Sequence, residues 1–261
     1  LDELCATADA LFVCTRLSER TRGLVTRRHI ESMKPSAYLI NVARGSVVDE
    51  PALVEAFPAD SSGLANLAFA HSQQRDMKQA MELGRKAAAI FPQNVGRRNN
   101  VALYAMYAGQ FEAAISESDT ARKINPAFVK AFVARALSEL ALGRPADAIK
   151  TYELLKAVSP AGASSAAMGL ADVALYEGRT RDAVAMLDAG IAADLAANNT
   201  SAAAFKRVAL ADAYLAQGNT TAAARQAEAA VAGTPSDAIN LTGGLLLART
   251  GQAAAALKIA D

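Results

Sequence analysis

The sequence predicts a mostly α-helical protein, in which a solenoid of about five and a half repeated helix pairs follows a small α/β segment. Three observations predict this fold class. Alanines and prolines recur every 34 residues, glycines return at a similar interval, and the composition changes from β-branched to alanine-rich near residue 57. We place the α/β segment at residues 1–57, a junction at 58–63 and the repeats at 64–261.

Composition and charge narrow the class of protein. The chain has 261 residues, of which 27 are basic, 26 acidic and 52% apolar, so it resembles a folded globular protein. A net charge of +1 provides no general attraction for nucleic acid or an anionic membrane. The sequence has no apolar run of the roughly 18 residues that a membrane-spanning helix needs, and its start does not resemble a signal peptide. We expect a cytoplasmic protein, with no nucleic-acid or membrane partner.

The ends and the cysteines give two further expectations. The chain starts without Met and stops within a helical pattern, so we expect a fragment at both ends. Cys5 and Cys14 are too few for a disulfide scaffold and have no metal-ligand spacing with His29 or His71. We therefore expect no metal site and two free thiols, with Cys14 buried on an apolar strand and Cys5 buried on the opening helix.

The first 57 residues alternate between strand and helix patterns. Two β-branched runs predict strands near residues 10–15 and 37–43, and the segments around them have helical spacing. The Pro, Asp, Ser and Gly residues of 58–63 are typical of a loop or a helix cap. This segment is therefore predicted to hold two strands with their helices, ending at the junction.

The later residues repeat a helix, a turn and a second helix. A glycine ends the first helix because it accepts the left-handed conformation, and small residues let the two backbones approach closely. A proline then stops the second helix. The repeated positions are Ala80, Ala114 and Ala148; Pro92, Pro126 and Pro160; and Gly109, Gly143, Gly178, Gly218 and Gly251. These spacings predict stacked helix pairs.

This pattern resembles the tetratricopeptide repeat (TPR). The second unit carries its small residue, turn glycine, alanines and proline at Ala102, Gly109, Ala114, Ala121 and Pro126. Arg75 replaces the turn glycine of the first unit. The 40-residue interval between two later glycines predicts an insertion near 193–204, with a lengthened helix end and a loop.

The resemblance implies a protein-interaction scaffold. TPR arrays bind extended peptides or partner helices on the concave face of their first helices. Counted from the turn glycines, that face would carry Phe69, Asn99, Leu103, Tyr107, Lys130, Val133, Asp172, Tyr176, Phe205 and Asp212. Apolar side chains and charges of both signs are mixed on it, so it indicates a protein or peptide partner without naming its class. A weaker similarity, to arrays appended to some bacterial serine/threonine kinases, suggests a bacterial context.

The first 57 residues resemble part of the NAD-binding domain of the D-isomer-specific 2-hydroxyacid dehydrogenases. The motif Asn-x-x-Arg-Gly-x-x-Val-Asp begins at Asn41 and ends at Asp49. By this resemblance Arg44 would orient the substrate carboxylate, since a planar guanidinium forms a two-pronged clamp. Thr15, Val42, Ala43 and Arg44 would lie against the dinucleotide.

Several parts of that enzyme site are missing from the sequence. No G-x-G-x-x-G phosphate fingerprint occurs, Arg16 stands where the family commonly has proline, and neither histidine has the family's Thr-Pro-His context. The family's catalytic Glu and His would fall where the repeats begin. We therefore expect no cofactor, with NAD only if this segment is functional, and no enzyme activity.

Three functional hypotheses follow. The first is a protein-interaction scaffold that binds its partner in the TPR groove. The second is an NAD-dependent oxidoreductase acting on 2-hydroxy acids, which we expect to be inactive as a fragment. The third is a chimeric join of two unrelated gene fragments, since the dehydrogenase-like sequence breaks off within a domain rather than at a linker.

Overall fold

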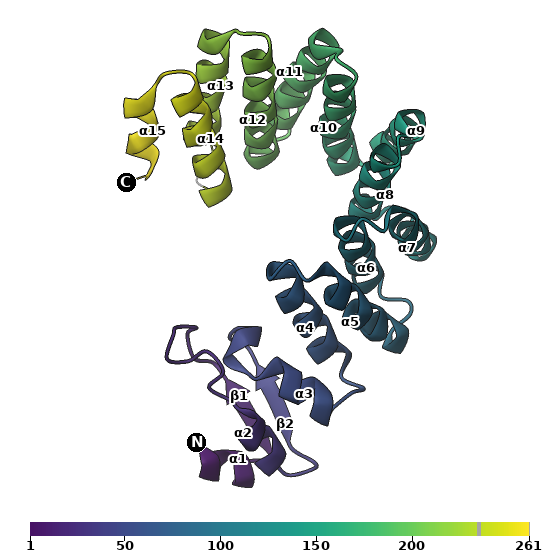
Figure 1. The fold of residues 1–261 in the computed structure, drawn as a ribbon, viewed down its shortest axis with the longest axis vertical. Coiled ribbons are helices and arrows are strands. Elements are labelled where there is room, and N and C mark those ends of the chain that lie inside the picture. Colours follow the sequence, from purple (N-terminus) through teal and green to yellow (C-terminus); the bar gives the residue numbers. More distant parts are fainter. Residues whose placement is uncertain (234–235, 261) are drawn as a thin grey trace. The chain divides into compact units, whose positions relative to one another are not determined.

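The N-terminal segment folds around two short parallel strands. The structure is a computed structural model that describes residues 1–233 and 236–260. Strand β1 pairs with β2, and the register runs from Ala10 opposite Tyr38 to Val13 opposite Asn41. Both strands predicted here are confirmed, although they are shorter than expected. The elements are α1 (Asp2–Thr7), β1 (Ala10–Val13), α2 (Arg27–Ser32), β2 (Tyr38–Asn41), the 3-10 helix η1 (Gly45–Val47) and α3 (Glu50–Ala56) (Figure 1).

A compact apolar core holds this segment together. Its buried members come from β1, from the α2 region and from the η1–α3 region, and they are Val13, Val25, Ile30, Val47, Val48 and Ala52. An isolated parallel bridge joins Val25 to Val48 beyond the two strands. The core therefore fixes the loops that follow β1 and β2 against α3.

Two expectations for this segment are wrong. Of the segments with helical spacing around the strands, residues 21–23 form turns, and the helix that carries His29 starts only at Arg27, where Thr26 and His29 form a capping box. Cys14 is exposed, because β1 ends at Val13 and Cys14 lies in the loop beyond it. Cys5 is buried on α1, as expected.

Six helix pairs follow within the described residues. The first and second helices of each pair are α4 (Ser61–Gln73) and α5 (Met77–Ile90), α6 (Val95–Tyr107) and α7 (Phe111–Ile124), α8 (Val129–Ala141) and α9 (Pro145–Lys156), α10 (Pro160–Tyr176) and α11 (Thr180–Ala196), α12 (Thr200–Ala216) and α13 (Thr220–Gly233), and α14 (Asp237–Arg249) and α15 (Ala253–Ala260). Consecutive helices pack together within each unit of the chain, which gives a helical solenoid (Figure 1). The predicted fold class is confirmed.

The turns within the pairs use the predicted glycines. The glycines at these turns have positive φ between 72° and 86°, and they are Gly109, Gly143, Gly178, Gly218 and Gly251. Arg75 adopts φ 63° at the same position of the first pair, although its side chain disfavours the left-handed region. The repeat therefore imposes this turn even where glycine is missing.

The predicted insertion near 193–204 has a different form. Helices α11 and α12 each have 17 residues and are joined by a tight turn. Asn198 adopts φ 56° in this turn, and Asn199 caps α12 by accepting a hydrogen bond from the backbone N–H of Ala202. The 40-residue interval thus comes from two long helices, and no long loop is inserted between these two described helices.

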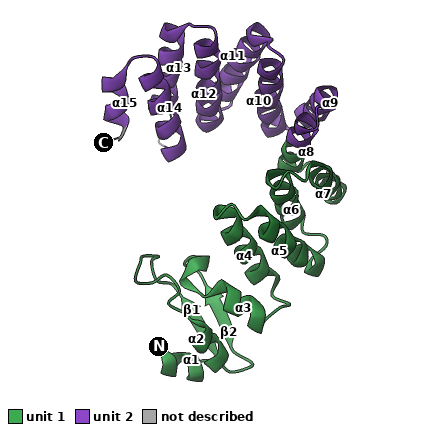
Figure 2. Cartoon of the chain, in the orientation of Figure 1, with its two compact units in different colours: residues 1–134 green, residues 135–261 purple. Residues whose placement is uncertain are grey.

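Small residues let the paired helices approach. The alanine that recurs near the start of the second helices is fully buried at Ala80, Ala114, Ala148, Ala183 and Ala223. Larger side chains fill the remaining space, as Tyr104 and Tyr152 do with exposures of 7% and 2%. The chain divides into two compact units, residues 1–134 and 135–261, which Figure 2 shows in different colours. Each unit is therefore described by itself.

Candidate functional sites on the first helices and at the strand ends

The first unit leaves two aromatic side chains exposed on its first helices. Phe69 on α4 is 58% exposed and Tyr107 on α6 is 66% exposed. Leu103, one turn before Tyr107 on α6, is half-buried. Asn99, expected on the same face, is only 2% exposed, and its Oδ1 atom has no hydrogen-bond partner among the described residues. Phe69 and Tyr107 are therefore the aromatic side chains of the predicted face that this unit offers to a partner.

The second unit repeats this arrangement on α10 and α12. Tyr176 is 76% exposed and Phe205 is 45% exposed. Asp172 lies one turn before Tyr176 and is also exposed. Asp212 on α12 accepts a hydrogen bond of 2.8 Å from Arg249 on α14. The exposed residues of this unit thus combine aromatic rings with charges of both signs.

Helix α8 carries the two remaining candidates. Lys130 is exposed near its start and Val133 is half-buried. Further along α8, the buried Glu139 accepts hydrogen bonds of 2.7 Å from Arg135 Nε and from Thr151 Oγ1. This cluster joins α8 to α9 and has a structural role.

The Asp172 carboxyl has an unusual protonation equilibrium. Although Asp172 is exposed as a residue, protein atoms crowd around its carboxyl group, and this partial desolvation raises its pKa from 3.8 to about 6. Nearby, desolvation is also the main cause that raises the pKa of the buried Tyr152 hydroxyl. The charge of this part of α10 therefore changes between mildly acidic and neutral pH.

In the N-terminal segment, all four predicted cofactor-contacting residues lie together. Thr15, Val42, Ala43 and Arg44 line a depression of about 400 Å³ at the carboxyl ends of β1 and β2. Cys14, Arg16 and Leu17 complete its lining. Arg44 is exposed there, and its Nη1 atom donates a 2.9 Å hydrogen bond to the carbonyl of Ala43. The carboxyl edge of parallel strands is where α/β folds bind ligands.

Two residues of the Asn-x-x-Arg-Gly-x-x-Val-Asp motif hold its backbone in place. The Asn41 side chain donates to the carbonyl of Arg44 at 2.8 Å and accepts from the N–H of Ala43 at 2.9 Å. Asp49 caps α3 by accepting from the N–H of Ala52. The motif therefore builds the loop that presents Arg44 at the strand end.

The described residues do not fit a complete dinucleotide. A pyrophosphate is normally held by a glycine-rich turn and the N-terminus of the following helix. The first glycine after β1, which ends at Val13, is Gly23, and no G-x-G-x-x-G occurs in the sequence. The depression could contact only one end of such a cofactor.

Sequence reasoning missed Glu50 in the first turn of α3. This side chain is 8% exposed and lines a pocket beside β2 and α4. Its neighbours in sequence, Asp49 and Pro51, are typical of a helix start, where acidic residues are usually solvated. The sequence around Glu50 contains no signal of its burial.

Two family models match separate parts of the chain. Residues 1–85 match the D-isomer specific 2-hydroxyacid dehydrogenase, NAD binding domain. Residues 102–166 and 208–261 match the tetratricopeptide repeat. The chain therefore joins a segment similar to the dehydrogenase NAD-binding domain to TPR repeats, as predicted. The first match continues past residue 63 into α4 and α5.

Curated relatives resemble only part of the chain. Glyoxylate/hydroxypyruvate reductase B of Pectobacterium carotovorum subsp. carotovorum (strain PC1) is 50% identical over 56 residues, which are 22% of this chain and 18% of that enzyme. Dehydrogenase efuE of Hormonema carpetanum is 31% identical over 126 residues, or 48% of this chain and 31% of that protein. The chain thus spans less than a third of the length of either relative.

Solved structures share the solenoid fold. Yeast Tom70 superposes with a TM-score of 0.65 at 13% identity, over 80% of this chain and 43% of Tom70. A thermophilic TPR protein of Thermus thermophilus gives a TM-score of 0.57 at 19% identity, over 76% of this chain and 98% of that protein. At these identities the likeness shows the fold alone.

Two kinds of feature are absent from the part of the chain that the structure describes. In residues 1–233 and 236–260, no helix has both the length and the apolar character needed to cross a bilayer. The same residues contain no group of three or more His, Cys, Asp or Glu side chains that could hold a metal ion.

Proposed function

We propose that the repeats form a protein-interaction scaffold, which binds a peptide or helix of a partner on the exposed face of its first helices. The observation that carries this proposal is the exposure of Phe69, Tyr107 and Tyr176, between 58% and 76%, on first helices whose partner helices bury a recurring alanine. Aromatic side chains, and tyrosine above all, are over-represented among the residues that dominate protein interfaces. The TPR fold supports the same role.

Charged side chains on the first helices of both units indicate the kind of partner. Lys130 is exposed in one repeat and Asp172 in the next, while Asp212 is already paired with Arg249. A partner segment with apolar anchors and charges of both signs would complement such a surface. This binding needs no cofactor.

Selection from a peptide library on the full chain would test the proposal. Tyr107 and Tyr176 lie in different units, so each selected peptide should bind at least one of the variants Tyr107→Ala and Tyr176→Ala at least about tenfold more weakly than the wild type, a loss of about 1.4 kcal/mol. Leu154→Ala is a matched control, because Leu154 is 55% exposed but lies on the second helix α9. The proposed binding on the first helices would be refuted if peptide affinity is unchanged in both tyrosine variants, or if the control loses as much affinity as they do.

A second candidate is an NAD-dependent reaction on a 2-hydroxy acid. It is favoured by the gathering of Thr15, Val42, Ala43 and Arg44 at one strand edge. We expect no turnover of NADH with 2-keto acids, because the chain lacks the glycine-rich cradle for the pyrophosphate. Turnover that disappears in Arg44→Ala would establish this function instead.

A third possibility is that the chain joins two unrelated genes. Single-molecule sequencing of the source DNA across codons 40–80 decides the question. Molecules that span these codons in frame would show that the join is natural. If no molecule spans them, the two parts belong to different proteins, and no single function should be assigned to the chain.

A further inference from the structure

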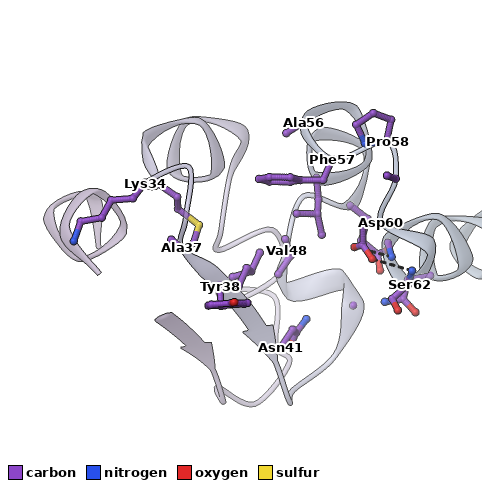
Figure 3. Close-up of a pocket in the computed structure, with 18 residues that line it drawn as sticks. Lys34, Ala37, Tyr38, Asn41, Val48, Ala56, Phe57, Pro58, Asp60 and Ser62 are labelled. Atoms are coloured by element: carbon purple, nitrogen blue, oxygen red, sulfur yellow. Dashed lines mark hydrogen bonds between the residues drawn. The ribbon is translucent and has the colours of Figure 1, made fainter. Parts of the chain in front are cut away.

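A pocket of about 610 Å³ lies between β2, α3 and the first turns of α4 (Figure 3). Its volume falls within the range of about 300–1,000 Å³ that is typical of small-molecule sites. Apolar side chains form much of its lining, among them Leu39, Val48 and Leu53. Figure 3 shows the rings of Tyr38 and Phe57 on two sides of it. This pocket is separate from the depression that holds Arg44.

The carboxylate of Glu50 belongs to this pocket. Glu50 is 8% exposed as a residue and lines the pocket, and its carboxylate oxygens are not among the fully buried atoms of the described residues that lack a partner, so they keep access to the pocket. Its carboxyl group rests against Gly45, where a Cβ atom would overlap Oε1. Burial raises the pKa of Glu50, and no neighbouring charge offsets this effect.

The other charged groups of the pocket are already engaged. Lys34 Nζ donates a 2.8 Å hydrogen bond to Asp9, outside the pocket. Asp60 caps α4 by accepting from the N–H groups of Ser62 and Gly63 at 2.9 and 3.0 Å. The described residues that line the pocket therefore supply no cation to Glu50, and removing part of the water around an unpaired carboxylate costs free energy.

We propose that this pocket binds a small organic ammonium ion, whose charge pairs with Glu50 and whose carbon body lies between Tyr38 and Phe57. The two rings suit such a ligand, because aromatic faces attract ammonium groups as well as apolar carbon. A neutral molecule of the same shape would fill the apolar space but would leave Glu50 unpaired.

Binding of phenethylammonium and its neutral analogue 2-phenylethanol to the full chain tests the proposal by NMR titration. We expect the ammonium ion to bind at least about tenfold more tightly than the alcohol, and Glu50→Gln to remove this preference. Glu55→Gln should keep it, because Glu55 is exposed and pairs with Arg27. Equal binding of the two probes, binding of neither, or a preference that survives in Glu50→Gln would overturn the proposal.

A measurement on the unaltered protein covers the case in which Glu50→Gln does not fold. Carbon-13 NMR follows the titration of the Glu50 carboxyl group with and without phenethylammonium. The bound cation favours the ionised carboxylate, so the pKa of Glu50 should fall. Lys34, Tyr38 and Asp60 also line the pocket, and their signals show whether another group responds instead. An unchanged Glu50 titration at saturating phenethylammonium would contradict the proposed pairing.

Discussion

The contact between Gly169 and Tyr152 should make Gly169→Ala destabilising, although alanine is the better helix former. Tyr152 is 2% exposed and its ring covers Gly169 on α10. An alanine Cβ would overlap ring atoms Cε1 and Cζ, and even Cε2 would lie 2.7 Å away. Carbon atoms in favourable contact lie about 3.5–4.0 Å apart, so the ring or the helix must move.

The expected magnitude follows from two opposing effects. Overpacking of a well-filled core costs about 1–3 kcal/mol. Replacing glycine by alanine within a helix contributes about 0.5–1 kcal/mol of stability. We therefore expect Gly169→Ala to lower the free energy of unfolding by about 1 kcal/mol, within a range of about 0–2.5 kcal/mol. Gly244→Ala is the matched control, because the nearest atom to its Cβ would lie at an ordinary 3.8 Å, and it should be stabilising.

Urea denaturation followed by circular dichroism measures the free energy of unfolding of both variants. Amide hydrogen exchange shows whether the loss of stability is localised to α9 and α10. In a Tyr152→Leu background, Gly169→Ala should lower the free energy of unfolding by less, because the ring that overlaps the new Cβ atom is absent. If Gly169→Ala is as stable as Gly244→Ala, or if its cost is the same in the Tyr152→Leu background, the packing argument is refuted.

Three further predictions concern a buried ion pair, a turn and a titrating carboxyl group. Lys206 Nζ lies 2.5 Å from Asp194 Oδ2, and both side chains are at most 5% exposed. Asp194→Ala should therefore lower the free energy of unfolding, measured by urea denaturation, by about 3–5 kcal/mol. The control Asp188→Ala, on the same helix α11, should change it by less than about 0.5 kcal/mol. Arg75→Gly should raise stability by about 0.5–1 kcal/mol, since φ is 63° there, and an unchanged urea midpoint would contradict this. Asp172 should titrate near pH 6 by NMR. Because its pKa is raised in the folded state, its contribution to stability is present below pH 3.8 and is lost as the pH rises through about 6. Asp172→Asn should remove this pH dependence of the free energy of unfolding.

The repeat fold could be predicted because its turns constrain the sequence directly. A left-handed residue is needed at each turn within a pair, and glycine supplies it at Gly109, Gly143, Gly178 and Gly218. The turn at Asn198 escaped prediction because asparagine also tolerates this conformation and is common elsewhere. The sequence then indicated an inserted loop where two longer helices meet.

Burial within an element was harder to predict. Successive helix residues point about 100° apart, so counting from a turn glycine can place a residue on the wrong side of its helix. Asn99 is buried at 2%, whereas Asn100 beside it is exposed. Cys14 was expected in the core, but β1 ends one residue earlier. In both cases a shift of one residue decides the environment of the side chain.

Glu50 illustrates information that no local pattern contains. Its sequence context predicts a solvated helix start, but in the fold it is 8% exposed and its carboxyl group rests against Gly45. Asp60, Ser62, Gly63 and Asn66 of the α4 region line the pocket together with residues of β2 and α3. The pocket therefore requires α4 as well as β2 and α3, and residues far apart in the sequence must come together to form it.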